Sequence, residues 1–97
     1  MVKLFISQPM RGKSDEEIRI EREIAKQEAE AKLGRPVEVI DSFFADHTMS
    51  PLECLGESLK LLAGADIAYF ARGWEQARGC RIEWRCAQDY DIPRIGA

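Results

Sequence analysis

The sequence predicts a small α/β domain in which a parallel β-sheet is covered by helices on both faces. Three observations indicate this fold. Short apolar runs alternate along the chain with longer segments of helical periodicity. The apolar runs are nearly continuous, as expected for parallel strands that are buried on both faces. The first two helical segments each begin with a capping box, in which Ser is followed three residues later by Glu.

Length and charge narrow the class of protein. The chain has 97 residues, so we expect a single domain over residues 1–97. The net charge of −3 argues against binding of a nucleic acid polymer, which usually leaves a basic surface. No apolar run is long enough to span a membrane, and a cytoplasmic protein is expected. A core of this size is modest, which favours a homo-oligomer such as a dimer.

The residues that usually bind metals are sparse. Cys54, Cys80 and Cys86 are widely spaced and form no CxxC pair, which indicates free thiols rather than disulfides or a zinc site. His47 is the single histidine, so a histidine metal cluster or a Ser-His-Asp site lacks residues unless His47 itself takes part. We therefore expect neither a metal nor a cofactor.

The first half of the chain has the pattern strand, helix, strand. Residues 2–7 are an apolar run that predicts a buried first strand. The helix that follows is capped by Ser14 and ends at Gly34, because Pro36 prevents its continuation. Residues 37–40 are the second strand. The helix is expected to bury one apolar stripe among many charges, formed by Ile18, Ile20, Ile24, Ala25, Ala29 and Leu33.

The second half repeats the alternation. A helix capped by Ser50 ends at Gly64, and its leucines share one stripe. Residues 67–70 are the third strand, residues 72–75 a loop, and residues 92–95 a last strand at the edge of the sheet. The stripe of the second helix comprises Leu52, Leu55, Leu59 and Leu62. A third helix over residues 78–90 is expected to bury Ile82, Cys86, Ala87 and Tyr90.

Right-handed crossovers allow a strand order of 2-1-3-4. Ligands of such sheets bind beyond the carboxyl ends of the strands, at the point where the order reverses. That crevice lies between the first and third strands, where the loops 8–13 and 72–78 converge. The candidate binding residues at this place are Gln8, Met10, Arg11, Gly12, Trp74, Arg78 and Gly79.

Residues 77–83 combine two kinds of chemistry. They are read as a loop that enters a helix, and a helix start carries free N–H groups and partial positive charge that suit an anion. Arg11 and Arg78 can each fork onto a phosphate, and Gly12 lets the backbone approach a ligand. Glu83 is the carboxylate placed both in the crevice and on a rigid element, and its ionised form is expected to be favoured there.

A fixed glutamate in this position suits attack on a sugar. The transition state at an anomeric carbon is cation-like, and a carboxylate stabilises it before bonding to it. Trp74, Phe43 and Phe44 offer apolar planes on which a base could stack. A phosphate-binding P-loop is the weaker alternative for residues 7–14, because Ser7 stands where that pattern needs Gly. Unless Asp41 serves, no aspartate ends a strand in the place needed to hold magnesium.

Three segments of the chain resemble the nucleoside 2-deoxyribosyltransferase superfamily. They are residues 5–12, residues 65–70, and residues 78–83 with Ala87 four positions later. This superfamily includes the deoxyribonucleoside 5′-monophosphate N-glycosidases and an uncharacterised phage and bacterial branch with the same strand-Pro-Met-Arg-Gly opening. The resemblance covers most of the chain in order. It implies a Rossmann-like, flavodoxin-like domain that works as a dimer or higher oligomer.

The resemblance also implies roles for single residues. Glu83 would be the nucleophile that forms a glycosyl-enzyme, and Gly79 the small residue of the phosphate or sugar site. Residues 10–12 would form the phosphate-side loop. Arg78 stands where the family often has Ser, which implies a tighter hold on an anion.

Two positions depart from the family pattern. Phe5 stands where a Tyr commonly hydrogen-bonds the nucleophile, and Ser58 where an Asp handles the proton of the base. Phe cannot form that hydrogen bond, and Ser is a poor proton donor. Two functions therefore stay open. One is an N-glycosidase or deoxyribosyltransferase that acts on a nucleotide or nucleoside through Glu83. The other is a catalytically silent module that binds a nucleotide or phosphate.

Overall fold

The structure is a computed structural model, and it describes residues 1–43 and 48–96. Its elements in chain order are β1 (Val2–Ser7), α1 (Asp15–Leu33), β2 (Val37–Val39), α2 (Pro51–Leu62), β3 (Ile67–Phe70), the short 3₁₀ helix η1 (Trp74–Gln76), α3 (Arg78–Asp89) and β4 (Arg94–Gly96). Phe44 and His47, which the sequence offered as a stacking ring and as the single histidine, lie outside the described residues.

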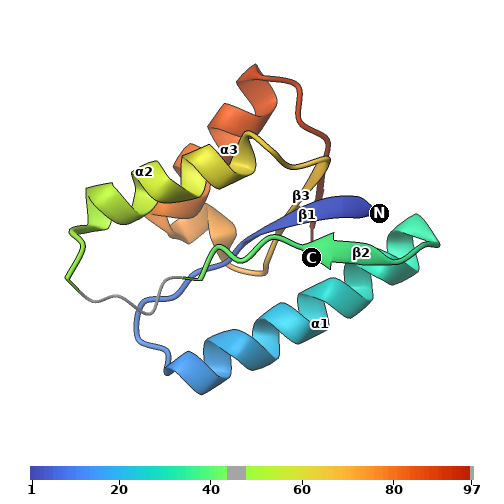
Figure 1. The fold of residues 1–97 in the computed structure, drawn as a ribbon. Helices are drawn as coiled ribbons and strands as arrows, with labels where there is room; N and C mark the ends of the chain where they lie inside the picture. Colours follow the sequence, from blue (N-terminus) through green and yellow to red (C-terminus); the bar gives the residue numbers. More distant parts are fainter. Residues whose placement is uncertain (44–47, 97) are drawn as a thin grey trace.

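The four strands form one parallel sheet in the order β2-β1-β3-β4. Helix α1 covers one face, and α2 and α3 cover the other (Figure 1). The predicted three-layer, Rossmann-like α/β fold with strand order 2-1-3-4 is therefore confirmed. The central strands β1 and β3 end level with each other, because Ser7 is the partner of Phe70 in their register. This level edge is where the loops after β1 and β3 leave the sheet.

The core is divided by the sheet into two apolar clusters, because side chains alternate along each strand. In β1, Leu4 and Ile6 pack on the α1 side with Ala25 and Ala29. Phe5 points the other way and packs under α2 and α3. Its buried partners there are Leu62, Ala68, Phe70 and Ala87.

The first two helices begin as their capping boxes predict. The Ser14 hydroxyl accepts a hydrogen bond from the Glu17 backbone N–H, and the Glu17 carboxylate accepts one from the Ser14 N–H. Ser50 and Glu53 form the same pair at the start of α2. Gly34 ends α1 in the left-handed conformation, with φ of 68°, that glycine adopts without strain.

The expected stripes of the first two helices are wrong at three positions. Ile20 and Ile24 are 54% and 50% exposed, and Leu52 is 76% exposed. Helix α1 lies on the sheet along a narrow line of residues, of which Ile18, Ala25 and Ala29 are buried. Ile20 and Ile24 are turned away from that line. Leu52 lies in the first turn of α2, at the opposite end from its buried residue Leu62.

The expected buried face of α3 is wrong in a way that bears on function. Ile82 is 37% exposed and Tyr90 is 80% exposed. Ala87 is buried as expected and Cys86 is half-buried, but the other buried residues are Cys80 and Glu83. The spacing of Cys80, Glu83 and Ala87, three and then four residues, places them on one side of the helix. The apolar periodicity therefore predicted the wrong buried face, because a carboxylate occupies a position on the buried side of α3.

Several boundaries also differ from the prediction. Strand β2 ends at Val39 rather than at residue 40. Residues 74–76 form the 3₁₀ helix η1 rather than part of a loop. The last strand is Arg94–Gly96 rather than residues 92–95. The Ile92 N–H donates to the carbonyl of Ala87 in α3, and only the Pro93 carbonyl, which accepts from Ala68 of β3, begins the pairing with the sheet. In the described part of the chain, no helix has the length and apolar character needed to cross a membrane.

Candidate active site

Ser7 and Glu83 meet at the carboxyl edge of the sheet. Ser7 is the last residue of β1, and its carbonyl accepts a hydrogen bond of 2.9 Å from the N–H of Ala71, just after β3. Glu83 lies in the second turn of α3, on the side that faces the sheet. Because Ser7 has the same parity along β1 as Phe5, it points to the α3 side of the sheet. The fold therefore brings together two polar residues that are 76 positions apart.

The Glu83 carboxylate is held by one oxygen. The Ser7 hydroxyl Oγ donates to Glu83 Oε1 over 2.6 Å, and the two residues are 1% and 8% exposed. Among the described residues, Oε2 has no hydrogen-bond partner. The one fully buried side-chain polar atom without a partner in this part of the chain is Arg94 Nη1. Oε2 is therefore not fully buried and keeps some contact with solvent.

Burial, rather than the helix start, dominates the titration of Glu83. Loss of solvent raises the pKa of the Glu83 carboxyl, and the hydrogen bond from Ser7 lowers it in part. The expectation that the helix N-terminus favours the ionised form is therefore wrong. Glu83 lies in the second turn, and the field of a helix end falls off within the first turn. The carboxyl keeps its proton to a higher pH than an exposed glutamate does.

Cys80 lies one turn before Glu83 on the same buried side of α3 and is 4% exposed. The pKa of its thiol is raised, and burial is the largest cause. The Glu83 carboxylate also raises this pKa, whereas the Ser7 hydroxyl and Lys13 lower it. A thiol with a raised pKa is a poor nucleophile. We therefore assign Cys80 a packing role, and Ser7 and Glu83 are the polar pair of the site. Cys54 and Cys86 are also free thiols, as the sequence predicts.

The start of α3 differs from the starts of the other two helices. Its N-cap is Ala77, whose side chain makes no hydrogen bond to the first turn. The N–H groups of that turn are therefore open to an anion. A Cβ atom added at Gly79 would meet no atom within 4 Å, so there is open space beside the turn. Arg78, the first residue of α3, is exposed.

The predicted loop after β1 reaches the same edge. Arg11 and Gly12 are exposed, and Met10 is half-buried. Gly12 has φ of 80°, a conformation that glycine adopts readily. Within residues 1–43 and 48–96, neither the Arg11 side chain nor the Arg78 side chain forms a hydrogen bond or an ion pair. Both guanidinium groups are thus available to a ligand, on segments that follow β1 and β3.

Gln8 belongs to a different network. It is 5% exposed, and its side-chain amide is bound by α1: Nε2 donates to Glu21 Oε1 over 3.2 Å, and Oε1 accepts from Arg22 Nη1 over 3.1 Å. Arg22 also donates to Ser42 Oγ over 3.2 Å. Gln8 therefore ties the end of β1 to α1, on the face of the sheet opposite Ser7.

Trp74 joins an aromatic cluster on the α3 face. Its ring stacks on Trp84, with centroids 4.6 Å apart and 24° between the planes, and it meets Phe70 edge-on at 5.5 Å. The Arg94 guanidinium lies 4.6 Å from the centre of the Trp84 ring. A base that stacked on Trp74 would have to use a ring already in contact with these neighbours. Phe43, the other described ring considered for stacking, lies 5.3 Å from the Arg19 guanidinium on the α1 side.

The sequence analysis does not identify Ser7 as a partner of Glu83. Two signals could have found it. The alternation along β1 gives Ser7 the same face as Phe5, and that face is the one that α3 covers. Cys80 and Glu83 are three residues apart on α3 and so share one side. The apolar pattern of Ile82, Cys86 and Tyr90 obscured the second signal.

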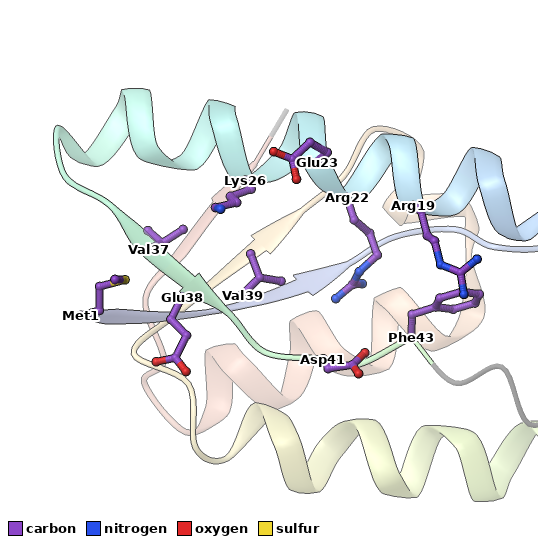
Figure 2. Close-up of a pocket in the computed structure, with 10 residues that line it drawn as sticks. All are labelled: Met1, Arg19, Arg22, Glu23, Lys26, Val37, Glu38, Val39, Asp41 and Phe43. Carbon is purple, nitrogen blue, oxygen red and sulfur yellow. The ribbon is translucent and has the colours of Figure 1, made fainter.

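Two hollows lie along α1, and both are lined by residues of that helix. The larger, of about 530 Å³, is at the β2 edge, and Figure 2 shows Arg19, Arg22 and Lys26 of α1 along it. Asp41 and Phe43 close its other side. The smaller, of about 170 Å³, is lined by residues that include Lys13, Tyr69 and Arg72. Glu83, Arg78 and Gly79 line neither hollow.

Potential metal ligands are dispersed. Among the described residues, no three His, Cys, Asp or Glu side chains gather as a metal site would require. The buried hydroxyl of Tyr69 instead donates to the carboxylate of Glu28, and burial raises the pKa of Tyr69 to about 12. These polar groups are satisfied by each other within the fold.

A comparison with solved structures finds a similar fold in the crystal structure of a conserved protein from Enterococcus faecalis V583. The TM-score is 0.68 and the sequences are 14% identical, with 99% of this chain and 62% of that chain covered. This chain therefore spans less than two thirds of the length of that protein. At this identity the likeness shows the fold alone. No protein-family model and no curated protein sequence matches the chain.

Proposed function

We propose that the protein is an N-glycosidase or deoxyribosyltransferase that cleaves the N-glycosidic bond of a nucleotide or nucleoside, with Glu83 as nucleophile. The observation that carries this proposal is the state of the Glu83 carboxylate. One oxygen is fixed by Ser7 over 2.6 Å, and the other is unpartnered among the described residues and is not fully buried. A rigid carboxylate with one open oxygen is suited to attack on an anomeric carbon.

The reaction proceeds in two displacements. Glu83 Oε2 bonds to the anomeric carbon while the carbon–nitrogen bond breaks and its electron pair leaves with the base, which takes up a proton. Water, or the nitrogen of a second base, then attacks the same carbon, gives up its proton to solvent and releases Glu83 as a carboxylate. This proton replaces the one that the departing base took from solvent. The developing positive charge on the sugar is stabilised by the negative carboxylate before the covalent bond forms.

The start of α3 is assigned to the anionic end of the substrate. Its first turn has no side-chain cap, and the space beside Gly79 is open. Arg78 and Arg11 approach from two separate segments and make no bond to another described residue. Free N–H groups together with two guanidinium groups form a site for a phosphate. This favours a nucleoside 5′-monophosphate over a nucleoside.

The proposal is tested by base release from a panel of ribonucleoside and deoxyribonucleoside 5′-monophosphates, followed by chromatography. The matched control is Glu83→Gln, which keeps the size of the side chain and an acceptor for Ser7 but removes the nucleophile. We expect release by the wild type and a loss of at least about a thousandfold in the variant, as for other removed nucleophiles. Release at equal rates by both proteins would exclude Glu83 from the role.

The second candidate function is a nucleotide- or phosphate-binding module without turnover. The structure offers one observation in its favour: Phe5 is 1% exposed inside the apolar cluster, and Ser58 is a half-buried residue of α2, so neither position offers a strong acid or base. Calorimetry distinguishes the two functions. A silent module binds a nucleotide with the same affinity in the wild type and in Glu83→Gln, and neither protein releases base.

We also propose that the protein works as a homodimer. Support comes from large apolar side chains that are exposed on the single chain, including Ile24 on α1, Leu52 on α2 and Tyr90 after α3. Light scattering during size-exclusion chromatography tests this. A single species with twice the mass of the chain is expected, and a monomer at all concentrations would overturn the proposal.

A further inference from the structure

The position of Ser7 is determined by the backbone of the sheet. Its Cα is in register with Phe70 of the neighbouring strand, and its carbonyl accepts from the N–H of Ala71 over 2.9 Å. The residue is 1% exposed, so its hydroxyl has no access to bulk water as an alternative partner. A donor on such a backbone keeps its place when a substrate binds, because moving it would break the pairing of the two central strands.

The hydroxyl holds a single oxygen of Glu83. Among the described residues, Ser7 is the only hydrogen-bond donor to this carboxylate. The bond to Oε1 fixes the rotation of the carboxyl group about its last side-chain torsion, which is otherwise broad. Oε2, which is not fully buried, is thereby held in one orientation.

The neighbouring residues do not supply an equivalent donor. Phe5 lies two residues earlier on the same face of β1 and has no polar atom. The Cys80 thiol, on α3 itself, is only a weak donor. Lys13, from the loop after β1, lowers the pKa of that thiol. Burial and the Ser7 hydroxyl are the influences that shift the pKa of the Glu83 carboxyl itself.

We propose that Ser7 is a positioning residue, which orients the Glu83 carboxylate through Oε1 and leaves Oε2 as the attacking oxygen. This inference rests on the function proposed above for Glu83. It predicts two separable effects of removing the hydroxyl. The ionised carboxylate loses a stabilising hydrogen bond, and the attacking oxygen loses its fixed direction.

The first effect is measured without any substrate. The titration of Glu83 is followed by NMR of the side-chain carboxyl carbon in glutamate-labelled protein, with Glu83→Gln to assign the signal. We expect the pKa of Glu83 to rise in Ser7→Ala and to stay near the wild-type value in Ser7→Thr, which keeps a hydroxyl. Ser42→Ala is the matched control, because it also removes a buried hydroxyl but one that contacts Arg22. An unchanged pKa in Ser7→Ala, or an equal rise in Ser42→Ala, would overturn the inference.

The second effect is measured by turnover of the nucleotide that the wild type cleaves best. We expect Ser7→Ala to lower kcat by about tenfold to a hundredfold, as for the loss of one hydrogen bond to a charged group, with KM little changed. Ser7→Thr should recover most of the rate. An unchanged kcat in Ser7→Ala overturns the positioning role. If no nucleotide is cleaved by the wild type, the proposed function fails, while the NMR titration still decides whether Ser7 controls Glu83.

Discussion

At the scale of single residues, the site depends on one buried carboxyl group. Glu83 is on the side of α3 that packs on the sheet, and its partner Ser7 is a small residue at the end of a central strand. Burial raises the pKa of Glu83, because it removes most of the water that would stabilise the charge. A carboxylate in this position destabilises the fold, so its presence favours a functional role over a structural one.

The burial of the Glu83 carboxyl group predicts how the free energy of unfolding depends on pH. The folded-state pKa of Glu83 is raised above the unfolded value, so the folded state keeps the proton longer. The contribution of Glu83 to the free energy of unfolding is therefore complete below the pKa of the unfolded state. It is lost as the pH rises through the pKa of the folded state. Glu83→Gln, which carries no charge, should be more stable than the wild type at neutral pH, by roughly 1 kcal/mol. Urea unfolding across a pH series measures this. A variant that is less stable by the same amount at every pH would contradict it.

Gly79 offers a second prediction at this scale. A Cβ atom added there meets no atom within 4 Å, so Gly79→Ala fits the fold. Alanine also favours the helix by up to about 1 kcal/mol relative to glycine. The added methyl group would nevertheless occupy the open space beside the first turn of α3. We expect an unchanged or higher unfolding temperature together with at least tenfold weaker nucleotide binding in calorimetry. Unchanged affinity would remove Gly79 from the binding site.

At the scale of elements, the three helices differ in how they begin. Helices α1 and α2 have complete capping boxes, which satisfy the first N–H groups with side chains of the same segment. Helix α3 starts after Ala77 with no side-chain cap. A helix start that lacks internal partners is less stable and more receptive to an anion. The difference fits a division of roles, in which α1 and α2 support the sheet and α3 presents the site.

Substitutions at the three N-cap positions test this division of roles. Ser14→Ala and Ser50→Ala should each lower the free energy of unfolding by about 1 kcal/mol, the usual value of an N-cap hydroxyl. Ala77→Ser should raise it by up to a similar amount, because Ala77 has the extended backbone of an N-cap, with φ of −103° and ψ of 122°. The new hydroxyl competes for the same N–H groups, so nucleotide affinity should fall in this variant. Stronger binding by Ala77→Ser would show that the N–H groups are not used.

At the scale of the whole molecule, the topology assembles the site from distant segments. Because β1 and β3 are neighbours with crossovers on opposite faces, the loops after them leave the same edge of the sheet (Figure 1). Ser7, Arg11 and Arg78 reach that edge from segments that are far apart in the sequence. The strand order therefore places the loops after β1 and β3, which carry Arg11 and Arg78, at one edge of the sheet.

The two arginines should act together on the anionic end of the substrate. We expect Arg11→Ala and Arg78→Ala each to weaken the binding of a nucleoside monophosphate about tenfold, a typical value for a charge-assisted hydrogen bond. The double variant should lose less than the product of the two effects, because both groups contact one phosphate. Affinity should fall as salt is added. If the loss of affinity in the double variant equals the product of the two single losses, the two guanidinium groups act at separate sites.

The strand order, and the meeting of the loops after β1 and β3 at one edge of the sheet, could be predicted because they follow from the alternation of elements and from the handedness of crossovers. The interior of the site could not be predicted in the same way. The apolar residues Ile82, Cys86 and Tyr90 on α3 match a helical stripe, yet packing on the sheet selects the side with Cys80 and Glu83. Whether a polar residue faces the core depends on a partner elsewhere in the chain. Here the partner is Ser7, which only the folded structure identifies.

The most direct test of the central claim is whether Glu83 forms a bond to a sugar. The protein is incubated with 2′-deoxy-2′-fluoro-arabinonucleoside 5′-monophosphates, because the electronegative fluorine destabilises the cation-like transition state and slows the release of the glycosyl-enzyme. Proteolysis and tandem mass spectrometry then locate any added sugar phosphate. We predict one adduct, on Glu83, that is absent from Glu83→Gln. An adduct on another residue, or base release from natural nucleotides by Glu83→Gln at the wild-type rate, would contradict the proposal.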